Sequence, residues 1–105
     1  FYQAFQQKDY RTMQECYHPD AVFSDPVFLS LSADEVKSMW EMLLTSSGDL
    51  KIIFTDIEER GNSGICHWEA FYTFSLTGRE VHNSIDATFI LRDGKIFRHD
   101  DRFDL

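Results

Sequence analysis

Four consecutive segments of the chain are rich in β-branched and aromatic residues, and short glycine-containing turns separate them. They are residues 51–59, 65–76, 80–91 and 95–105. Strand-like runs joined by such turns predict an antiparallel meander. One face of a meander must be buried against another layer, so this feature limits the fold more than any other.

The chain ahead of these segments carries helix signals. A first helix is expected to end near Lys8, and Asp9 is suited to cap a second helix. Ser32 and Glu35 form a capping box before a third helix, whose apolar face runs to Ser46. Helices followed by a meander predict an α+β fold, with three N-terminal helices packed on one face of an antiparallel sheet.

Composition and charge narrow the classes of function. At 105 residues, we expect one domain, residues 1–105, large enough to bury a core. Aromatic residues make up 15% of the chain, which favours a lined cavity or a buried subunit interface. The net charge of −8 argues against nucleic acid and anionic membranes as partners. No run approaches the ~20 apolar residues that a bilayer span needs.

The two cysteines, Cys16 and Cys66, fall on a predicted helix and a predicted strand without paired spacing. Buried free thiols are expected, which fits a reducing compartment and a cytoplasmic location. The chain starts at Phe1 rather than at a methionine. It therefore looks trimmed, which leaves room for a targeting peptide upstream.

Alternation predicts which side chains of two strands face inward. In residues 65–76 the apolar positions are the even ones: Cys66, Trp68, Ala70, Tyr72 and Phe74. In residues 95–105 the inward positions are the odd ones: Phe97, His99, Asp101, Phe103 and Leu105. The segment between them is ambiguous, because its odd positions are apolar while His82 and Asp86 lie on its polar even face.

A two-residue hairpin at Asp93-Gly94 would pair Asp86 with Asp101 across the strands. Cross-strand partners share a face, so this register turns Asp86 inward, with the two Cβ atoms ~4.5–5.5 Å apart. Two carboxylates that close cannot both ionise easily, so one pKa should rise. Ala70 is then the expected neighbour of Asp86, where its small side chain leaves room for a ligand. The apolar odd face must be covered by something else, most simply a second subunit.

The same register would bring two imidazoles and two carboxylates to one face, a set that can hold a divalent ion. These four residues are His82, Asp86, His99 and Asp101. No ligand-spacing motif accompanies them, so neither a metal nor a cofactor is expected. Asp25, which precedes Pro26, suits a turn as well as a pocket.

The run from Tyr17 to Pro26, with its Tyr-x-x-Asp-Ala-x-x-x-Asp-Pro pattern, resembles the nuclear transport factor 2-like superfamily. The helix after it and the four strands that end in Asp93-Gly94-Lys95-Ile96 extend the resemblance over essentially the whole chain. This superfamily includes ketosteroid isomerases, SnoaL-like polyketide cyclases and limonene epoxide hydrolases. The resemblance implies a cone in which helices and a strongly curved sheet enclose an apolar pocket, and a homodimer through the convex sheet face.

The resemblance also implies roles for single residues. Asp25 matches the general base of ketosteroid isomerases, and Asp86 matches their protonated acid that helps to hold an oxyanion. The oxyanion tyrosine of that family falls at Phe1, and Tyr2 is expected to face elsewhere. Trp40 stands where a supporting tyrosine is expected.

Two other branches of the superfamily involve the C-terminal strand. The ending around Asp101 resembles that of limonene epoxide hydrolases and places Asp101 on a catalytic carboxylate, although their Arg-x-Asp pair is absent. In SnoaL-like cyclases an acidic residue and a histidine do acid–base work, which Asp101 and His99 match.

We therefore expect a pocket that binds a small apolar, steroid- or polyketide-like molecule, with isomerase or cyclase chemistry left open. The alternative is a non-catalytic ligand-binding or protein-interaction module on the same fold. The expected pocket walls are Tyr17, Trp40, Trp68, Ala70, Tyr72, Phe74, His82 and Phe103.

Overall fold

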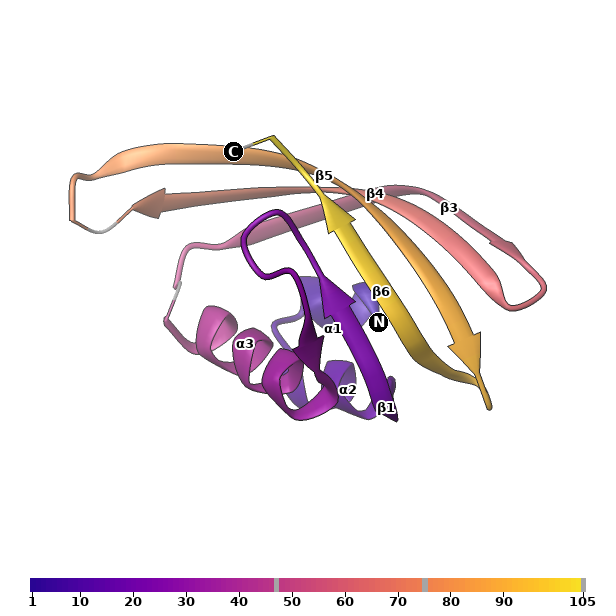
Figure 1. Cartoon of the computed structure of the whole chain (residues 1–105). Helices are drawn as coiled ribbons and strands as arrows, with labels where there is room; N and C mark the ends of the chain where they lie inside the picture. Colours follow the sequence, from indigo (N-terminus) through magenta and orange to yellow (C-terminus); the bar gives the residue numbers. More distant parts are fainter. Residues whose placement is uncertain (47, 75, 105) are drawn as a thin grey trace.

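The computed structural model describes residues 1–46, 48–74 and 76–104, except for the side chain of Phe74 (Figure 1). In these ranges the elements are α1 (Tyr2–Gln6), α2 (Tyr10–Glu15), β1 (Tyr17–Ser24), β2 (Leu31–Ser32), α3 (Ala33–Ser46), β3 (Lys51–Arg60), β4 (Ser63–Phe74), β5 (Arg79–Arg92) and β6 (Lys95–Arg102). The strands form one sheet in the order β2-β1-β6-β5-β4-β3. The sheet curves over the three helices, and the predicted α+β fold class is confirmed (Figure 1).

Both predicted helix caps are present. The Asp9 carboxylate accepts hydrogen bonds from the Thr12 backbone at 3.2 Å and the Thr12 hydroxyl at 2.6 Å. Ser32 and Glu35 exchange the two bonds of a capping box, at 3.0 and 3.3 Å. The sequence predicts that the second helix runs to Tyr17, but it ends at Glu15, and Tyr17 is the first residue of β1.

The sheet is mixed rather than purely antiparallel. β1 runs parallel to β6 and pairs Tyr17 with Ile96 and Phe23 with His99. The long connection through α3 and β3–β5 makes a parallel pair possible, since such a pair needs a crossover rather than a tight turn. This pairing brings the first strand of the chain beside the strand that carries His99.

The β5–β6 hairpin begins as predicted and then changes register. Asp93 and Gly94 both have positive φ, 55° and 74°, as the tight hairpin turns of this type require. The register then shifts between Ile90 and Leu91, so that Phe97 becomes the extra residue of a β-bulge. The Phe97 ring is held in place by the guanidinium of Arg92, 3.9 Å from its centroid.

Because of the bulge, the neighbours of Asp86 differ from the predicted ones. Ala87 pairs with Asp101, and Asp86 pairs with Arg102 on β6 and with His67 on β4. The prediction that Asp86 faces inward beside Asp101 is therefore wrong, and its side chain is 81% exposed. Ala70, the other predicted neighbour of Asp86, pairs with Asn83.

Phe97 was predicted to face inward, but at the bulge Ile96 is buried instead and Phe97 is half-buried. The remaining inward positions checked on β4 and β6 are as predicted. Trp68 and Ala70 on β4 are buried, and so are His99 and Asp101 on β6, as predicted. On β5 the odd positions face inward, and Ile85 and Ala87 are buried in the core. The helices of the same chain cover this apolar face, so it does not need a second subunit.

The core connects the helices to the inner face of the sheet. The Phe5 ring of α1 is fully buried and lies 5.1 Å from the Trp40 ring of α3 and 5.0 Å from the Trp68 ring of β4. Cys16 and Cys66 are free thiols, the first half-buried and the second buried. None of the helices in the described ranges is both long and apolar enough to cross a membrane.

The outer face of β4 and β5 carries a group of paired histidines and carboxylates. His67 Nδ1 lies 2.8 Å from Asp86 Oδ1, and His82 Nε2 lies 2.6 Å from Glu69 Oε1. His82 and Asp86 therefore lie on the opposite side of the sheet from His99 and Asp101, so the four-residue set considered above does not share a face. A homodimer through this convex face stays a prediction of the family resemblance.

The pair of His67 and Asp86 gives a test of the corrected register. The hydrogen bond with Asp86 raises the pKa of His67 above its ordinary value of about 6.5. We expect Asp86→Asn to lower the pKa of His67, measured by NMR titration of its imidazole. A raised folded-state pKa stabilises the fold below the unfolded value and ceases to do so as the pH rises through the folded value. The substitution should therefore lower the free energy of unfolding more at about pH 5.5 than at about pH 8.5.

Asp100→Asn is the matched control, because Asp100 is an exposed carboxylate on the outer face of β6. If Asp86→Asn left the titration of His67 unchanged, the pairing of Asp86 with His67 on the outer face of β4 and β5 would be wrong.

Candidate functional site

Four polar side chains form a hydrogen-bonded chain inside the cone. The indole nitrogen of Trp40 donates to the Tyr17 hydroxyl at 2.8 Å. The same hydroxyl lies 2.8 Å from His99 Nδ1, and His99 Nε2 lies 3.0 Å from Asp101 Oδ1. The chain links α3, β1 and β6, three elements that are far apart in the sequence.

The donor and acceptor roles in this chain follow from hydrogen-bond satisfaction. An indole nitrogen can only donate, so the Tyr17 oxygen accepts that bond and is left with one proton to donate. His99 Nδ1 is the acceptor in reach, which leaves the imidazole hydrogen on Nε2, pointing at Asp101. With a neutral His99 and an ionised Asp101, every donor in the chain has an acceptor.

Aromatic rings surround the imidazole and keep water away from it. The rings of Phe89 and Phe23 lie 4.5 and 4.9 Å from the His99 ring, and the Phe1 ring lies 5.6 Å from it. His99 is 1% exposed and Asp101 is 3% exposed. A carboxylate that is buried away from water needs a hydrogen bond from the protein, and His99 donates it.

Tyr17 is the fixed donor at the other end of the imidazole. Burial holds the pKa of its hydroxyl well above the ordinary value, although the bond from Trp40 acts in the opposite direction. The phenol therefore keeps its proton and orients the imidazole.

Asp101 lies at the end of a row of small inward-facing side chains. Cys66 pairs with Ala87, and Ala87 pairs with Asp101, so the three residues cross β4, β5 and β6 side by side. Ala87 is buried and lies between the thiol and the carboxylate. Burial raises the pKa of the Cys66 thiol to about 11, so it stays neutral.

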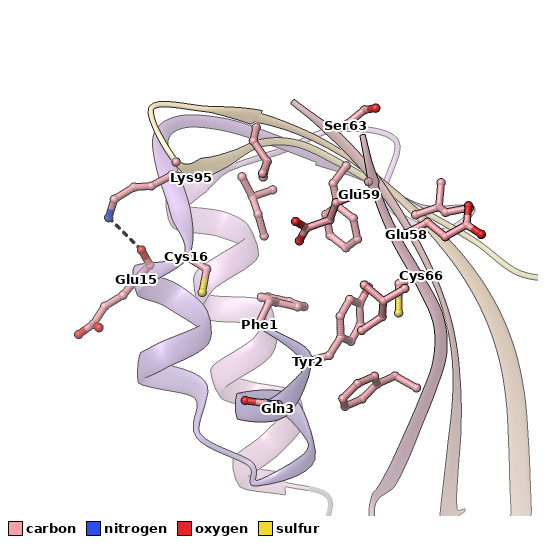
Figure 2. A pocket seen from close by; sticks show the side chains of 18 residues that line it. Phe1, Tyr2, Gln3, Glu15, Cys16, Glu58, Glu59, Ser63, Cys66 and Lys95 are labelled. Atoms are coloured by element: carbon pink, nitrogen blue, oxygen red, sulfur yellow. Dashed lines mark hydrogen bonds between the residues drawn. The ribbon is translucent and has the colours of Figure 1, made fainter. Parts of the chain in front are cut away.

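A cavity of about 520 Å³ opens between the helices and the inner face of the sheet. Its aromatic walls are Phe1, Tyr2, Phe54 and Phe89. Figure 2 shows Phe1, Tyr2 and Cys66 around the space. Charged groups also line it, with Glu58, Glu59 and Lys95 among them. The Lys95 ammonium donates a hydrogen bond to the backbone oxygen of Glu15 at 2.9 Å.

The cavity and the hydrogen-bonded chain adjoin without sharing a residue. Tyr2 and Cys66 line the cavity, and both are close enough to Asp101 for its charge to act on their hydroxyl and thiol. Phe1 and Phe89 line the cavity, and their rings also lie next to the His99 ring. The carboxylate therefore lies one layer of side chains behind the cavity wall.

The structure brings together some of the predicted site residues and separates others. Tyr17, Trp40, His99 and Asp101 form the buried chain. Trp68 and Ala70 belong to the core, and Tyr72 and Phe103 are half-buried at its border. The described lining of the cavity includes none of the eight predicted wall residues. His82 is wrong as a wall residue because it lies on the outer face, and the side chain of Phe74 lies outside the described part of the chain.

The three predicted carboxylates do not converge. Asp25 holds a turn, because its Oδ1 accepts from the backbone nitrogens of Val27 and Phe28 at 2.8 and 2.6 Å. Asp86 lies on the outer face, so Asp101 is the one of the three that is buried in the cone. The turn that the sequence allowed for Asp25 is thus the arrangement observed, and a catalytic role for it stays a prediction.

The sequence did not lead us to expect Tyr2 in the cavity wall, because its side chain was predicted to point away from that of Phe1. Both side chains line the cavity, and their rings lie 5.1 Å apart, edge to face. The signal was available, since Phe1, Tyr2 and Phe5 share one helical stripe. Phe89 was not predicted as a cavity residue, because the register counted from the Asp93-Gly94 turn placed the odd positions of its strand on the outer face.

Comparisons with known proteins identify the domain family and the fold. The family model of the SnoaL-like domain matches residues 1–99. No curated protein matches the chain. Among solved structures, IdmH from Streptomyces antibioticus, a proposed polyketide cyclase, is 24% identical over 98% of this chain and 86% of its own, with a TM-score of 0.81.

Two further solved structures share the fold. TerC, co-crystallised with polyporic acid, is 22% identical over 98% of this chain and 85% of its own, with a TM-score of 0.80. A limonene epoxide hydrolase-like enzyme from M. tuberculosis is 17% identical over 97% of this chain and 75% of its own, with a TM-score of 0.75. At these identities the likeness concerns the fold alone.

Tyr17→Phe tests the hydrogen-bonded chain. The substitution leaves the Trp40 indole and His99 Nδ1 without their shared partner, so we expect the free energy of unfolding to fall by about 2–3 kcal/mol. Urea denaturation measures it. Tyr10→Phe is the control, since Tyr10 is half-buried outside the chain of bonds, and we expect a loss below about 0.5 kcal/mol. Equal effects of the two substitutions would contradict the network.

Proposed function

We propose that this chain, which belongs to the SnoaL-like domain family, binds a small ring-bearing molecule in its cone and moves a proton next to a carbonyl group of that molecule. This membership confirms the resemblance to the nuclear transport factor 2-like superfamily. The observation that carries the proposal is the buried chain from Trp40 to Asp101, which lies directly behind an aromatic cavity.

The chemistry of the buried chain suits a general base. His99 bonds Oδ1 of Asp101, so Oδ2 is the oxygen that can take a proton. The aromatic surroundings keep water from competing for the carboxylate, which strengthens its interaction with a substrate proton. Tyr17 and Trp40 fix the orientation of the imidazole, so the carboxylate is held before a ligand arrives.

The walls of the cavity indicate the class of ligand. Four aromatic rings form much of the lining, and flat ring systems pack well against such surfaces. A volume of about 520 Å³ is within the usual range of small-molecule sites. IdmH, a proposed polyketide cyclase, and TerC, co-crystallised with polyporic acid, have the same fold and support a ligand of this kind.

During the reaction the ligand would place the carbon next to its carbonyl group beside Asp101 Oδ2. The C–H bond at that carbon breaks, its proton goes to Asp101 Oδ2, and its electron pair forms the enolate. Return of the proton to another position of the ligand gives isomerisation. Attack of the enolate carbon on a second carbonyl carbon of the same ligand gives ring closure instead: the C=O π bond breaks, and its oxygen takes the proton from Asp101 to become a hydroxyl.

The second candidate is a non-catalytic ligand-binding module. One observation favours it: Asp101 is 3% exposed, and the cavity ends at Tyr2 and Cys66 rather than at the carboxylate. In that case the buried chain of hydrogen bonds serves to hold α3, β1 and β6 together, and the cavity binds its ligand without chemistry.

Asp101→Asn separates the two candidates. The probe is 2-tetralone, a bicyclic ketone, and the measurement is exchange of its α-hydrogens with D2O, followed by ¹H NMR. We expect the wild-type protein to catalyse this exchange and Asp101→Asn to slow it by about 100-fold or more, because the amide cannot act as the base.

Asp100→Asn, on the adjacent outward-facing position, is the control and should exchange like the wild type. If the wild type binds 2-tetralone but the exchange rate is the same with and without protein, the acid–base proposal is wrong and the binding module remains.

A further inference from the structure

The wall of the cavity carries one carboxylate that points into it from the sheet. Glu59 on β3 pairs with Gly64, a cavity residue, whereas the neighbouring Glu58 pairs with Ile65, which is 48% exposed. Figure 2 shows the Glu59 carboxylate directed into the space between the helices and the sheet, and the Glu58 carboxylate directed away from it. Two adjacent glutamates of one strand therefore face opposite sides of the sheet.

Gly64 leaves room beside the Glu59 side chain. A Cβ atom at position 64 would lie 3.8 Å from Cγ of Glu59 and 4.0 Å from Cδ2 of Phe89. Gly64 pairs with Glu59 on one side and with Phe89 on the other, and all three residues line the cavity. A carboxylate and an aromatic ring thus border the part of the cavity wall where residue 64 has no side chain.

Among the residues that the structure describes, no lysine or arginine pairs with the Glu59 carboxylate. Every ion pair in these residues includes a histidine, and none includes Glu59. Lys95 is the one lysine or arginine in the described lining of the cavity. Its ammonium donates to the backbone oxygen of Glu15, on the helix side of the space (Figure 2). The negative charge of Glu59 is therefore available to a ligand.

We propose that Glu59 is a specificity-determining residue of the cavity, which selects ring compounds that carry a protonated amino group over those that carry a carboxylate. This inference rests on the proposed function of the cavity, and it names the class of ligand. The ammonium group of the ligand lies between the Glu59 carboxylate and the Phe89 ring. Both a carboxylate and the face of an aromatic ring attract a cation, and both disfavour an anion at the same place.

The size of the effect follows from the exposure of the side chain. Glu59 is exposed to solvent, and water and salt weaken an exposed ion pair to a factor of about two to five in affinity. The net charge of −8 on the whole chain also attracts cations, whatever the position of the charges. A control variant must therefore separate the position of Glu59 from the total charge of the protein.

The experiment uses three probes of one shape: 2-aminotetralin, which is cationic at about pH 7, tetralin, which is neutral, and tetralin-2-carboxylate, which is anionic. Binding is measured by ¹H–¹⁵N NMR titration, with the backbone amide of Gly64 as the reporter in the cavity wall. We expect the wild type to bind the amine about tenfold more tightly than the carboxylate. Glu59→Gln should reduce this ratio about fivefold and leave the affinity for tetralin unchanged.

Glu58→Gln is the matched control, because it removes the same charge one residue away, on the opposite face of the sheet, and should keep the wild-type ratio. If both substitutions reduced the ratio equally, the total charge of the protein would explain the preference, and the role of Glu59 would be wrong. An unchanged ratio in Glu59→Gln would also contradict the inference, while tetralin binding at Gly64 would still support a cavity for ring compounds. If none of the probes shifted the Gly64 signal, the proposed function of the cavity and this inference would both be wrong.

Discussion

The buried hydrogen bonds from Trp40 through Tyr17 and His99 to Asp101 are the interaction on which the rest of the structure depends. A polar group in an apolar core is tolerated only when it is bonded, so each member of this chain needs the others in place. The parallel pairing of β1 with β6 provides this, because it brings Tyr17 close to a histidine 82 positions later in the sequence. The fold and the candidate site therefore arise from the same arrangement.

Local signals predicted the local structure well. The caps at Asp9 and at Ser32 with Glu35 were readable because their bonds join residues three apart. The inward direction of His99 and Asp101 followed from alternation within one strand. The partner of His99 could not be found in this way. Tyr17 looked like the end of a helix, and only the distant pairing of β1 with β6 gives its hydroxyl a role.

The error over Asp86 shows how two local rules can conflict. Counting outward from the Asp93-Gly94 turn placed Asp86 inside, whereas the alternation of its own strand placed it outside. A single extra residue, Phe97, decides between them, since a bulge shifts every later pair by one. The shift buries Ile85 and Ala87 and leaves Asp86 in solvent, so one carboxylate rather than two enters the cone. The bulge thereby avoids the repulsion between buried like charges that the predicted register would have created.

The two buried tyrosines of this region differ in whether their hydroxyl groups have a hydrogen-bond partner. Tyr17 is fully bonded within the protein, so its hydroxyl has no bond left for a ligand, and its removal should cost stability. Tyr2 is also buried, but its hydroxyl has no hydrogen-bond partner in the described part of the chain, which destabilises the fold. Tyr17 reaches Asp101 through His99, and the charge of Asp101 also acts on the Tyr2 hydroxyl. Tyr17 therefore orients His99, and through the imidazole it fixes the position of the Asp101 carboxylate.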